Sequence, residues 1–468
     1  MLFNSVEYWL FLPLVWLLYF GLPFKIRWIW LLVCSYFFYG FWKAEFAALM
    51  AFTSLIDWWC ARQTEKQEKP GLRKFWLWFS ILSNVAMLFM FKYFDFALGG
   101  SELANKLYHN PYTAWLIELG KYTIPAGISF YTFQSISYVV DVYRKKEKAE
   151  KNLFRFMLYV SFFPQLVAGP IERFGKLHTQ LFQKYMPVWE DIRAGGRLLL
   201  YGLFLKVCVA DNLAGVVDTW YHSPEQYTLF SAWMAVFCFA FQVYADFFGY
   251  SLLAQGSALL FGVHLMDNFT KPYIAKSVPE FWHRWHISLS TWFRDYIFIP
   301  VGGNKQGVIV LSFSVLLVFF TSGLWHGANT TMIVFGLSQG ILYLFDRFAF
   351  SRIPFNGRIW DVFRQVKTFA FFMLTLVWFR SPDLPMSSRV FSLLQGKNTG
   401  TMQLELQWTV LGMLALFIVL DLFLVPGRID VWFQRFPLPV RWAMYAILAV
   451  CIAWLGGAAD HPFVYFQF

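Results

Sequence analysis

The chain has 468 residues, of which 58% are hydrophobic and 14% are charged, and it carries a formal net charge of +11. Soluble domains contain about a quarter charged residues, so this composition excludes an ordinary soluble protein and indicates an integral membrane protein. The apolar runs are long and continuous, which predicts spanning helices rather than the alternating strands of a membrane barrel. We therefore expect an all-α polytopic integral membrane protein with a single domain over residues 1–468.

The positive charge has its simplest explanation in basic loops between spans, which are typical of the cytoplasmic side of a membrane protein. Because no basic segment falls outside such a loop, nucleic acid is not an expected partner, whereas the lipid bilayer is. The five cysteines are scattered, and none shows the C-x-x-C spacing of a zinc site or a redox pair. We therefore expect neither a disulfide framework nor a zinc site.

Apolar runs long enough to cross a bilayer, or nearly to cross it, recur along the whole chain. They lie near residues 7–23, 28–44, 46–60, 75–97, 122–142, 153–170, 197–215, 228–262, 307–322, 330–348, 368–380, 408–425 and 440–457. Several are shorter than the ~20 residues of a simple span, so we expect these to be tilted, or re-entrant and buried within the protein. The prediction is roughly eleven transmembrane helices, with short or re-entrant helices between them.

Two clusters of basic residues, at 62–74 and 144–151, set the expected orientation of the first spans. Both are expected to be cytoplasmic, which places the segment between them, Leu98–Lys121, outside the cell together with the N-terminus. The first apolar run, Tyr8–Phe24, lacks a small-residue cleavage site, so we expect a span rather than a signal peptide.

Glycine and proline interrupt the apolar sequence at Pro125–Gln134 and at Ser161–Arg173. Non-helical backbone at membrane depth is tolerated where it is buried in protein, so these segments are expected to shape the interior. No internal repeat is visible, and the pattern therefore does not favour an inverted-repeat transporter.

The segments PEFWHRWHISLSTWFRDY and FTSGLWHGAN hold three histidines within otherwise apolar surroundings. Polar groups are costly in lipid and usually face a bundle interior or a water-filled cavity, so this polar region is where we expect chemistry. His326 lies between glycines, which permit a close approach of the backbone to a ligand or a neighbouring helix. An imidazole exchanges protons near neutral pH, which suits a general base. A structural histidine bonded to a carbonyl group is the alternative that the residue alone leaves open.

His283 and His286 lie three residues apart, so a single helix would place both on one face. With Glu280 they form E-x-x-H-x-x-H, which resembles a metal site. The chain supplies too few clustered histidines for a membrane di-iron centre, so we expect no metal, and we expect His283 at a surface or rim. His286 is the stronger functional candidate, and residues 268–272 predict a helix break before this segment.

Asp246 is an acid inside an apolar run, and intramembrane acids are expected to have both a function and a partner. Arg284 and Arg294 are the expected partners, and with Asp295 they would form a polar lining or an interfacial ion-pair network. A structural ion pair and a catalytic role both stay open for Asp246. The chain has no G-x-S-x-G elbow, P-loop or G-x-G-x-x-G, so we expect histidine chemistry without a covalent nucleophile.

Six segments occur in the order of a known family: MLFNSVEYWLFLPL, IPAGISFYTFQSISYVVDVYR, FFPQLVAGPIERF, DFFGYS, FWHRWHISLSTWFRDYIFIPVGGNK and SGLWHGAN. Over most of its length the chain resembles the membrane-bound O-acyltransferase family, in particular its bacterial branch of polysaccharide O-acetylation. The branch that transfers D-alanine to teichoic acid is more distant, and the IPVGGNK ending favours acetyl transfer. Phe248 and Leu252 stand where the alginate-like proteins often have Ser and a second Asp.

The resemblance implies helices arranged around a central tunnel through the membrane. Acetyl-CoA would enter from the cytoplasm as the acyl donor, without a tightly bound cofactor, and the acyl group would pass to an acceptor reached from outside. His326 matches the family's signature histidine and His286 its second tunnel histidine, so both are implied to be catalytic. Further positions are expected to line the tunnel: Asp246, Asn268, Trp285, Ser288, Arg294, Trp325 and Asn329.

The resemblance therefore implies a bacterial inner-membrane enzyme that O-acetylates a cell-envelope polysaccharide, either peptidoglycan, alginate or another exopolysaccharide. The family also implies a separate periplasmic acetyltransferase of the SGNH type as a partner. Three other functions stay open: a transporter or flippase for an envelope precursor, D-alanyl transfer to teichoic acid, and a non-catalytic scaffold for an extracytoplasmic transferase.

Overall fold

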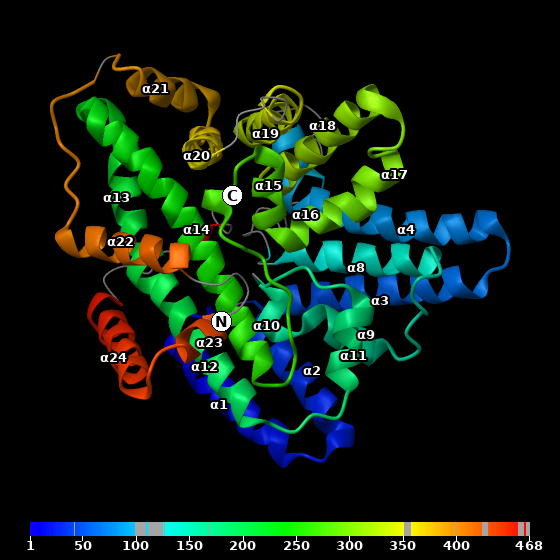
Figure 1. Cartoon of the computed structure of the whole chain (residues 1–468). Coiled ribbons are helices and arrows are strands. Elements are labelled where there is room, and N and C mark those ends of the chain that lie inside the picture. Colours follow the sequence, from blue (N-terminus) through cyan, green and yellow to red (C-terminus); the bar gives the residue numbers. More distant parts are fainter. Residues whose placement is uncertain are drawn as a thin grey trace. The chain divides into compact units, whose positions relative to one another are not determined.

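The computed structural model describes residues 1–41, 43–98, 109–110, 125, 127–167, 169–350, 357–397, 399–423, 429–456 and 463–464. The regular structure of these residues is helical (Figure 1), with one isolated bridge between Tyr227 and Met402. The expected all-α fold is confirmed. The chain divides into two compact units, Met1–Gly195 with Leu253–Met266 and Gly196–Leu252 with Asp267–Phe468. That residues 1–468 work as one domain stays a prediction.

Six helical segments within the described residues are long and apolar enough to cross a membrane, by length and composition. They are Pro70–Tyr93, Trp189–His222, Leu229–Leu259, Gly307–His326, Arg358–Arg380 and Leu438–Leu455. Two shorter apolar helices, Val6–Gly21 and Trp408–Phe423, accompany them. The count of roughly eleven crossings is not confirmed, because several predicted runs form helices that are too short or too polar for a simple span. Most of Leu98–Lys121 lies outside the described residues, and the orientation stays a prediction.

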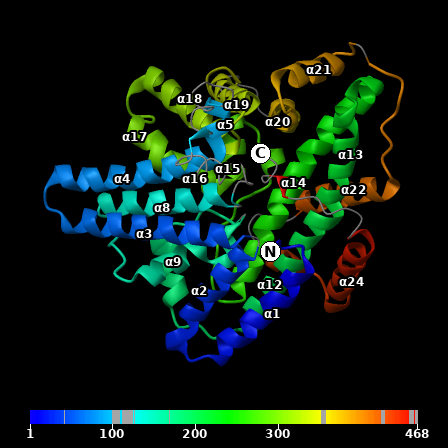
Figure 2. The same cartoon turned by 180° about the vertical axis from the view of Figure 1, so that it is seen from behind.

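The first unit contains a layer of three long helices, α3 (Ala44–Lys66), α4 (Pro70–Leu88) and α8 (Ile128–Tyr143), which run side by side in Figures 1 and 2. Buried polar contacts join α3 to α4. Asp57 Oδ1 accepts hydrogen bonds from Ser80 Oγ at 2.6 Å and from Asn84 Nδ2 at 2.7 Å. A buried carboxylate needs such donors, since an unsatisfied one would be costly. The other helices among the described residues of this unit include α1 (Val6–Gly21), α2 (Phe24–Gly40), the π-helical turn η1 (Phe89–Tyr93), α5 (Phe94–Leu98), α9 (Leu153–Ser161), α10 (Phe163–Leu166) and α11 (Phe174–Phe182).

The two predicted glycine and proline interruptions pack against each other in this unit. Gly127 precedes α8 with a φ of +76°, and a Cβ there would collide with the carbonyl oxygen of Leu166. Gln134 Nε2 donates to the Tyr159 carbonyl at 2.7 Å, which ties α8 to α9. Glycine is needed at position 127 for both its φ and its close backbone contact.

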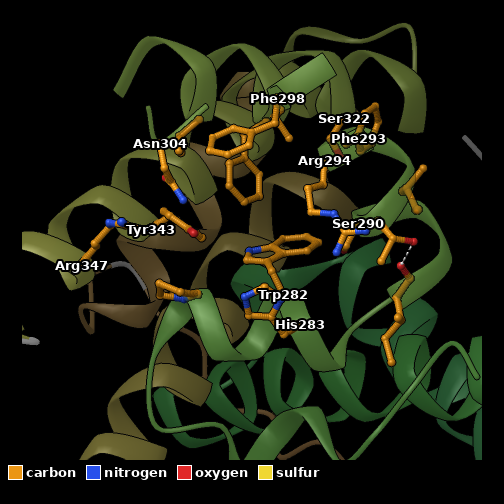
Figure 3. Close-up of a pocket in the computed structure, with 17 residues that line it drawn as sticks. Trp282, His283, Ser290, Phe293, Arg294, Phe298, Asn304, Ser322, Tyr343 and Arg347 are labelled. Atoms are coloured by element: carbon orange, nitrogen blue, oxygen red, sulfur yellow. Dashed lines mark hydrogen bonds between the residues drawn. The ribbon is translucent and has the colours of Figure 1, made fainter. Parts of the chain in front are cut away.

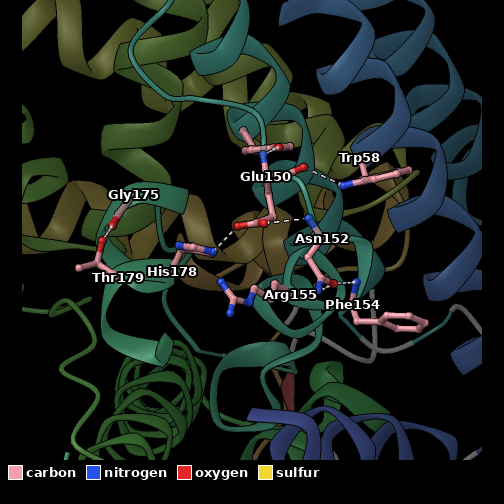
Figure 4. Close-up of polar contacts among 9 residues, drawn as sticks. Trp58, Glu150, Asn152, Phe154, Arg155, Gly175, His178 and Thr179 are labelled. Atoms are coloured by element: carbon pink, nitrogen blue, oxygen red, sulfur yellow. Dashed lines mark hydrogen bonds and ion pairs between the residues drawn. The ribbon is translucent and has the colours of Figure 1, made fainter. Parts of the chain in front are cut away.

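A polar cluster anchors the basic segment that follows α8 (Figure 4). His178 Nε2 on α11 lies 2.6 Å from Glu150 Oε2, and the Asn152 N–H donates to Glu150 Oε1 at 2.8 Å. The Trp58 indole on α3 donates to the Glu150 carbonyl at 2.8 Å. This loop is therefore fixed from both sides, by α3 and by α11.

The second unit is built around α14 (Leu229–Leu259), whose side chains between Ala232 and Leu252 are mostly buried. Its segments up to α18 are α12 (Trp189–Leu203, which begins in the first unit), the π-helical turn η2 (Phe204–Ala210), α13 (Asp211–His222), the 3₁₀ turns η3 (Pro224–Gln226) and η4 (Pro272–Ile274), α15 (Val278–Arg284), α16 (Ile287–Phe293), the π-helical turn η5 (Arg294–Phe298) and α17 (Ile299–Val301). They continue as α18 (Gly307–His326), α19 (Thr330–Phe348), α20 (Arg358–Arg380), α21 (Leu384–Leu394), α22 (Trp408–Phe423), α23 (Ile429–Gln434) and α24 (Leu438–Leu455).

Helices α18 and α19 form a closely packed hairpin. A Cβ on Gly323 would collide with the Met332 carbonyl, and a Cβ on Gly336 would lie 3.0 Å from Gly323 Cα. Small residues let two backbones approach closely, which is a common packing device in membrane proteins. This hairpin fixes the end of α18, where His326 lies.

Candidate functional site

His286 lies at a sharp turn between two short helices. Helix α15 ends at Arg284, and His286 caps α16 in the left-handed conformation, with φ +43° and ψ +55°. The expectation that His283 and His286 share one helical face is therefore wrong, because the helix ends between them. His283 is exposed, as expected, and His286 is only 1% exposed.

Asn268 holds this turn in place. Its carbonyl oxygen accepts from the Ile287 N–H at 3.0 Å, and its Oδ1 accepts from the Ser288 N–H at 3.3 Å. Its Nδ2 donates to Ser251 Oγ on α14 at 3.1 Å. The predicted break is confirmed, because residues 268–271 are non-helical and Pro272 begins the short 3₁₀ turn η4. Within this break, Asn268 connects α14 to the His286 turn.

The imidazole of His286 is enclosed by aromatic rings. The centroid of the Phe247 ring lies 4.6 Å away in an edge-on arrangement, and that of Trp325 lies 6.0 Å away. The ring centroid of Phe463, near the C-terminus, lies 5.6 Å from that of Phe247. His286 lies outside the candidate spans, and burial, followed by the charge of a protonated His326, lowers its pKa well below the ordinary value. His286 is therefore neutral at neutral pH.

His326 is the last residue of α18 and is 5% exposed. Its ring centroid lies 5.5 Å from that of Phe379 on α20 and 4.9 Å from that of Trp325. Trp325 thus contacts both imidazoles. The structure brings the two histidines singled out in the sequence into one buried aromatic cluster, in which they interact electrostatically.

Asp246 has a different partner from the ones expected. Its Oδ1 lies 3.0 Å from Lys206 Nζ, which also lies 2.7 Å from Asp211 Oδ1, and its Oδ2 accepts from the Val464 N–H at 2.7 Å. The expected pairing with Arg284 or Arg294 is wrong, because each arginine has a carboxylate close by in sequence. Arg284 pairs with Glu280 at 2.5 Å, and Arg294 pairs with Asp295 at 2.8 Å. Of the two roles left open for Asp246, the geometry favours the structural ion pair.

The remaining predicted residues have varied surroundings. Trp285 is buried in an aromatic cluster, with its ring 5.0 Å from those of Phe269 and Phe372. Ser288 is buried directly after the His286 turn. Asn329 caps α19 by accepting from the Thr331 N–H at 3.2 Å, and it donates to the Pro382 carbonyl. Asn329 thus stabilises the loop that follows His326.

A cavity of about 270 Å³ adjoins this cluster (Figure 3). Ile287 and Ser290, from the helix that His286 caps, form part of its wall, and Ser322, one turn before His326, forms another. His283 and Arg294 also line it. Among the described residues, no group of three or more His, Cys, Asp or Glu side chains is arranged to hold a metal ion.

Three features of the site were not predicted. Lys206 pairs with Asp246. It is a lone cation in an apolar run, and this pattern could have predicted a buried acidic partner. Asp346 anchors the start of α15 by accepting from the Val278 N–H at 2.6 Å, and it also pairs with Lys367. No local pattern indicates that Phe463 packs beside Phe247, since that contact joins distant parts of the chain.

Apolar helices of spanning length and a buried histidine pair define the class: a multi-pass membrane protein with two histidines buried in its interior. Residues 145–377, which include both histidines, match the sequence model of MBOAT, the membrane-bound O-acyltransferase family. The chain belongs to this family, as the resemblance indicated, and it is an acyltransferase.

Three relatives show where it falls within the family. A protein named "Probable alginate O-acetylase" from Pseudomonas syringae pv. tomato is 35% identical over 84% of this chain and 74% of its own length. A peptidoglycan O-acetyltransferase from Helicobacter pylori is 32% identical over 79% of this chain and 74% of its own. A teichoic acid D-alanyltransferase from Bacillus subtilis is 25% identical over 46% of this chain and 57% of its own.

Proposed function

We propose that this protein transfers acetyl groups from cytoplasmic acetyl-CoA across the bacterial inner membrane, for O-acetylation of a cell-envelope polysaccharide. The observation that carries the proposal is the buried pair of His286 and His326, inside the region that matches the acyltransferase family. Two comparisons with relatives agree with it. The similarity to O-acetylating relatives covers most of the chain, and that to the D-alanyl transferase covers under half.

The chemistry proposed for the pair is general base catalysis. The imidazole of His326 takes the proton from an acceptor hydroxyl while the hydroxyl oxygen attacks the carbonyl carbon of the thioester. The carbon–sulfur bond breaks, and the proton passes to the departing thiolate of coenzyme A. His286 lines the path as a neutral imidazole and a hydrogen-bonding group. The surrounding rings exclude water, which would protect the thioester from hydrolysis.

The acceptor proposed is a polysaccharide such as alginate or peptidoglycan, because the relatives with the longest alignments are named for these polymers. A separate periplasmic acetyltransferase of the SGNH type would complete the transfer to the polymer. No tightly bound cofactor is needed, since the thioester supplies the activated acyl group. The tunnel through which the acyl group passes is part of this proposal.

The test is acetyl transfer from radiolabelled acetyl-CoA to an acceptor polysaccharide by purified protein in proteoliposomes, with the periplasmic transferase present. Removal of a positioned general base typically costs 10²–10⁴-fold in rate, so we expect losses of this order for His326→Ala. His264→Ala is the matched control, because His264 is exposed and outside the cluster, and it should retain wild-type activity. A folded His326→Ala variant with normal activity would show that the site is misassigned and would support the scaffold. A wild-type protein that carries an envelope precursor but never cleaves the thioester would support the transporter.

A further inference from the structure

The cavity beside the histidine cluster is lined by basic side chains and by no acidic ones among the described residues. Arg294, Arg347 and His283 line it, and no Asp or Glu is among the described residues of its wall. Arg294 is paired with Asp295 through its Nε at 2.8 Å, but the Asp295 side chain is not part of the lining. The wall thus offers two guanidinium groups as hydrogen-bond donors and no carboxylate, which favours an anionic ligand.

Most of the remaining wall is apolar and aromatic. Trp282 and Phe319 are buried and lie edge-on to each other with ring centroids 5.1 Å apart, and Phe298 adds a third ring. Trp282 is fixed because its indole N–H donates to Gln339 Oε1 at 3.2 Å. A rigid aromatic wall binds a ring or a hydrocarbon segment, so the ligand that fits carries both a charge and an uncharged part.

The positions of the two arginines limit the ligand further. Figure 3 draws Arg294 and Arg347 on opposite sides of the Trp282 ring, with Tyr343 and Asn304 near Arg347. A ligand that reaches both guanidinium groups therefore extends across the aromatic wall. The volume of about 270 Å³ exceeds the needs of a small inorganic ion but is below the roughly 300–1,000 Å³ of a complete drug-sized site.

We propose that this cavity binds the phosphate-bearing part of an extended phosphate ester, with Arg294 and Arg347 holding the charged groups and Trp282 contacting the uncharged part. Guanidinium groups suit phosphate because their planar donors match two of its oxygens. Two sources share this chemistry, a coenzyme A thioester and an anionic phospholipid. The first deepens the proposed function and rests on it, because the cavity wall includes the helix that His286 caps. The second is independent of acyl transfer.

Binding measurements on the purified full-length protein separate the two sources. One arm measures binding of radiolabelled coenzyme A to protein in phosphatidylcholine nanodiscs. The other measures retention of phosphatidylglycerol by detergent-purified protein in native mass spectrometry. We expect one of these ligands to bind about tenfold more weakly to Arg347→Gln or Arg294→Gln, which is the size of one lost charge-assisted hydrogen bond.

Two controls keep the result specific. Arg389→Gln removes an exposed arginine of the same unit that does not line the cavity, and it should bind like wild type. His326→Ala should also retain binding, so unchanged transfer by this variant, with binding intact, would contradict the proposed function and leave the cavity assignment standing. Two results would overturn the proposal. In the first, each ligand binds to both cavity variants as tightly as to wild type. In the second, wild type binds neither ligand.

Discussion

His286 combines two properties that are unusual in one residue, burial and a left-handed backbone. Among the described residues, the non-glycine positions with positive φ are Lys145, Lys271 and His286. Such a conformation costs a residue with a Cβ about 1–2 kcal/mol and persists only where neighbouring contacts impose it. Here the Asn268 hydrogen bonds to the following two N–H groups impose it. The turn therefore lowers the stability of the fold somewhat, and it fixes the position of the imidazole.

The left-handed backbone at position 286 predicts an order of stability among variants that all lack the imidazole. Asn and Gly adopt the left-handed region more readily than Ala, so His286→Asn and His286→Gly should be more stable than His286→Ala by about 1 kcal/mol. All three should lose acetyl transfer, because none has the imidazole that lines the path beside His326. Thermal unfolding in one detergent, beside the transfer assay, checks both parts. An alanine variant as stable as the other two would show that the turn is not strained.

Among single residues, the sequence predicted the two buried histidines better than it predicted the partner of Asp246. His326 and His286 were identifiable because ionisable residues in apolar surroundings are rare and functional. The partner of Asp246 was predicted wrongly, because proximity in sequence favoured the arginines of the next segment. Those arginines are engaged by local acids, and Lys206 reaches Asp246 from a different helix. Pairings of this kind depend on the tertiary fold.

Among the helices, the α18–α19 hairpin has the most direct effect on the site, because His326 ends α18. Replacement of Gly336 by Ala should destabilise the protein by about 1–3 kcal/mol, since the new Cβ would meet the backbone of α18, which has no room to move aside. Activity per folded molecule should also fall, because α18 would shift. Unfolding and transfer assays on the same preparation measure both effects.

Gly412→Ala is the matched control for the hairpin variant. Gly412 lies inside α22, and a Cβ at this position would have nothing within 4 Å, so alanine there should be neutral or stabilising by up to about 1 kcal/mol. If Gly336→Ala were as well tolerated as Gly412→Ala, close packing of the hairpin would not be what positions His326.

The Glu150 cluster predicts a pH dependence for the loop between α8 and α9. Burial acts most strongly on the Glu150 carboxyl and raises its pKa, but the hydrogen bonds from His178 and Asn152 and the His178 charge together hold that pKa below the ordinary value. A lowered folded-state pKa means that Glu150 stabilises the fold above the ordinary Glu pKa of about 4.3. That contribution is lost as the pH falls through the lower folded-state value.

Glu150→Gln should therefore lower the free energy of unfolding by about 1–2 kcal/mol at neutral pH. This difference from wild type should disappear in acid. Glu190→Gln serves as the control, because Glu190 forms an exposed pair with Arg193 three residues away, whose loss should cost at most about 0.5 kcal/mol. Unfolding midpoints of the three proteins from pH 7 down to about pH 3, which extends below the ordinary Glu pKa of about 4.3, provide the comparison. A Glu150→Gln penalty that does not shrink toward low pH would contradict the assigned ion pair.

At the scale of elements, the apolar runs predicted the helices closely but not their number of crossings. The run at 330–348 coincides with α19, and that at 228–262 with α14. Hydrophobicity marks where a helix can form. Whether it crosses the membrane depends on tilt and on neighbouring helices, so a count of roughly eleven could not follow from apolar runs alone. A helix over PEFWHRWH was expected, but the break at His286 that separates α15 from α16 was not, because Asn268 makes it from outside the segment.

For the whole molecule, composition alone identified the class. A chain with 14% charged residues and long apolar runs is a membrane protein, and its motifs place it among the acyltransferases. The proposed function adds a direction to this chemistry, because donor and acceptor are on opposite sides of the bilayer. The interior histidine pair is the point where the two sides would meet.

The most direct test of that claim is the sidedness of transfer. Proteoliposomes would contain radiolabelled acetyl-CoA on the cytoplasmic face of oriented protein, with the polysaccharide acceptor and the periplasmic transferase only on the other face. We predict labelled polysaccharide on the far side with wild-type protein and a loss of at least about 10²-fold with His326→Ala. Label that reaches the acceptor equally well with His326→Ala, or only when donor and acceptor share one face, would contradict it.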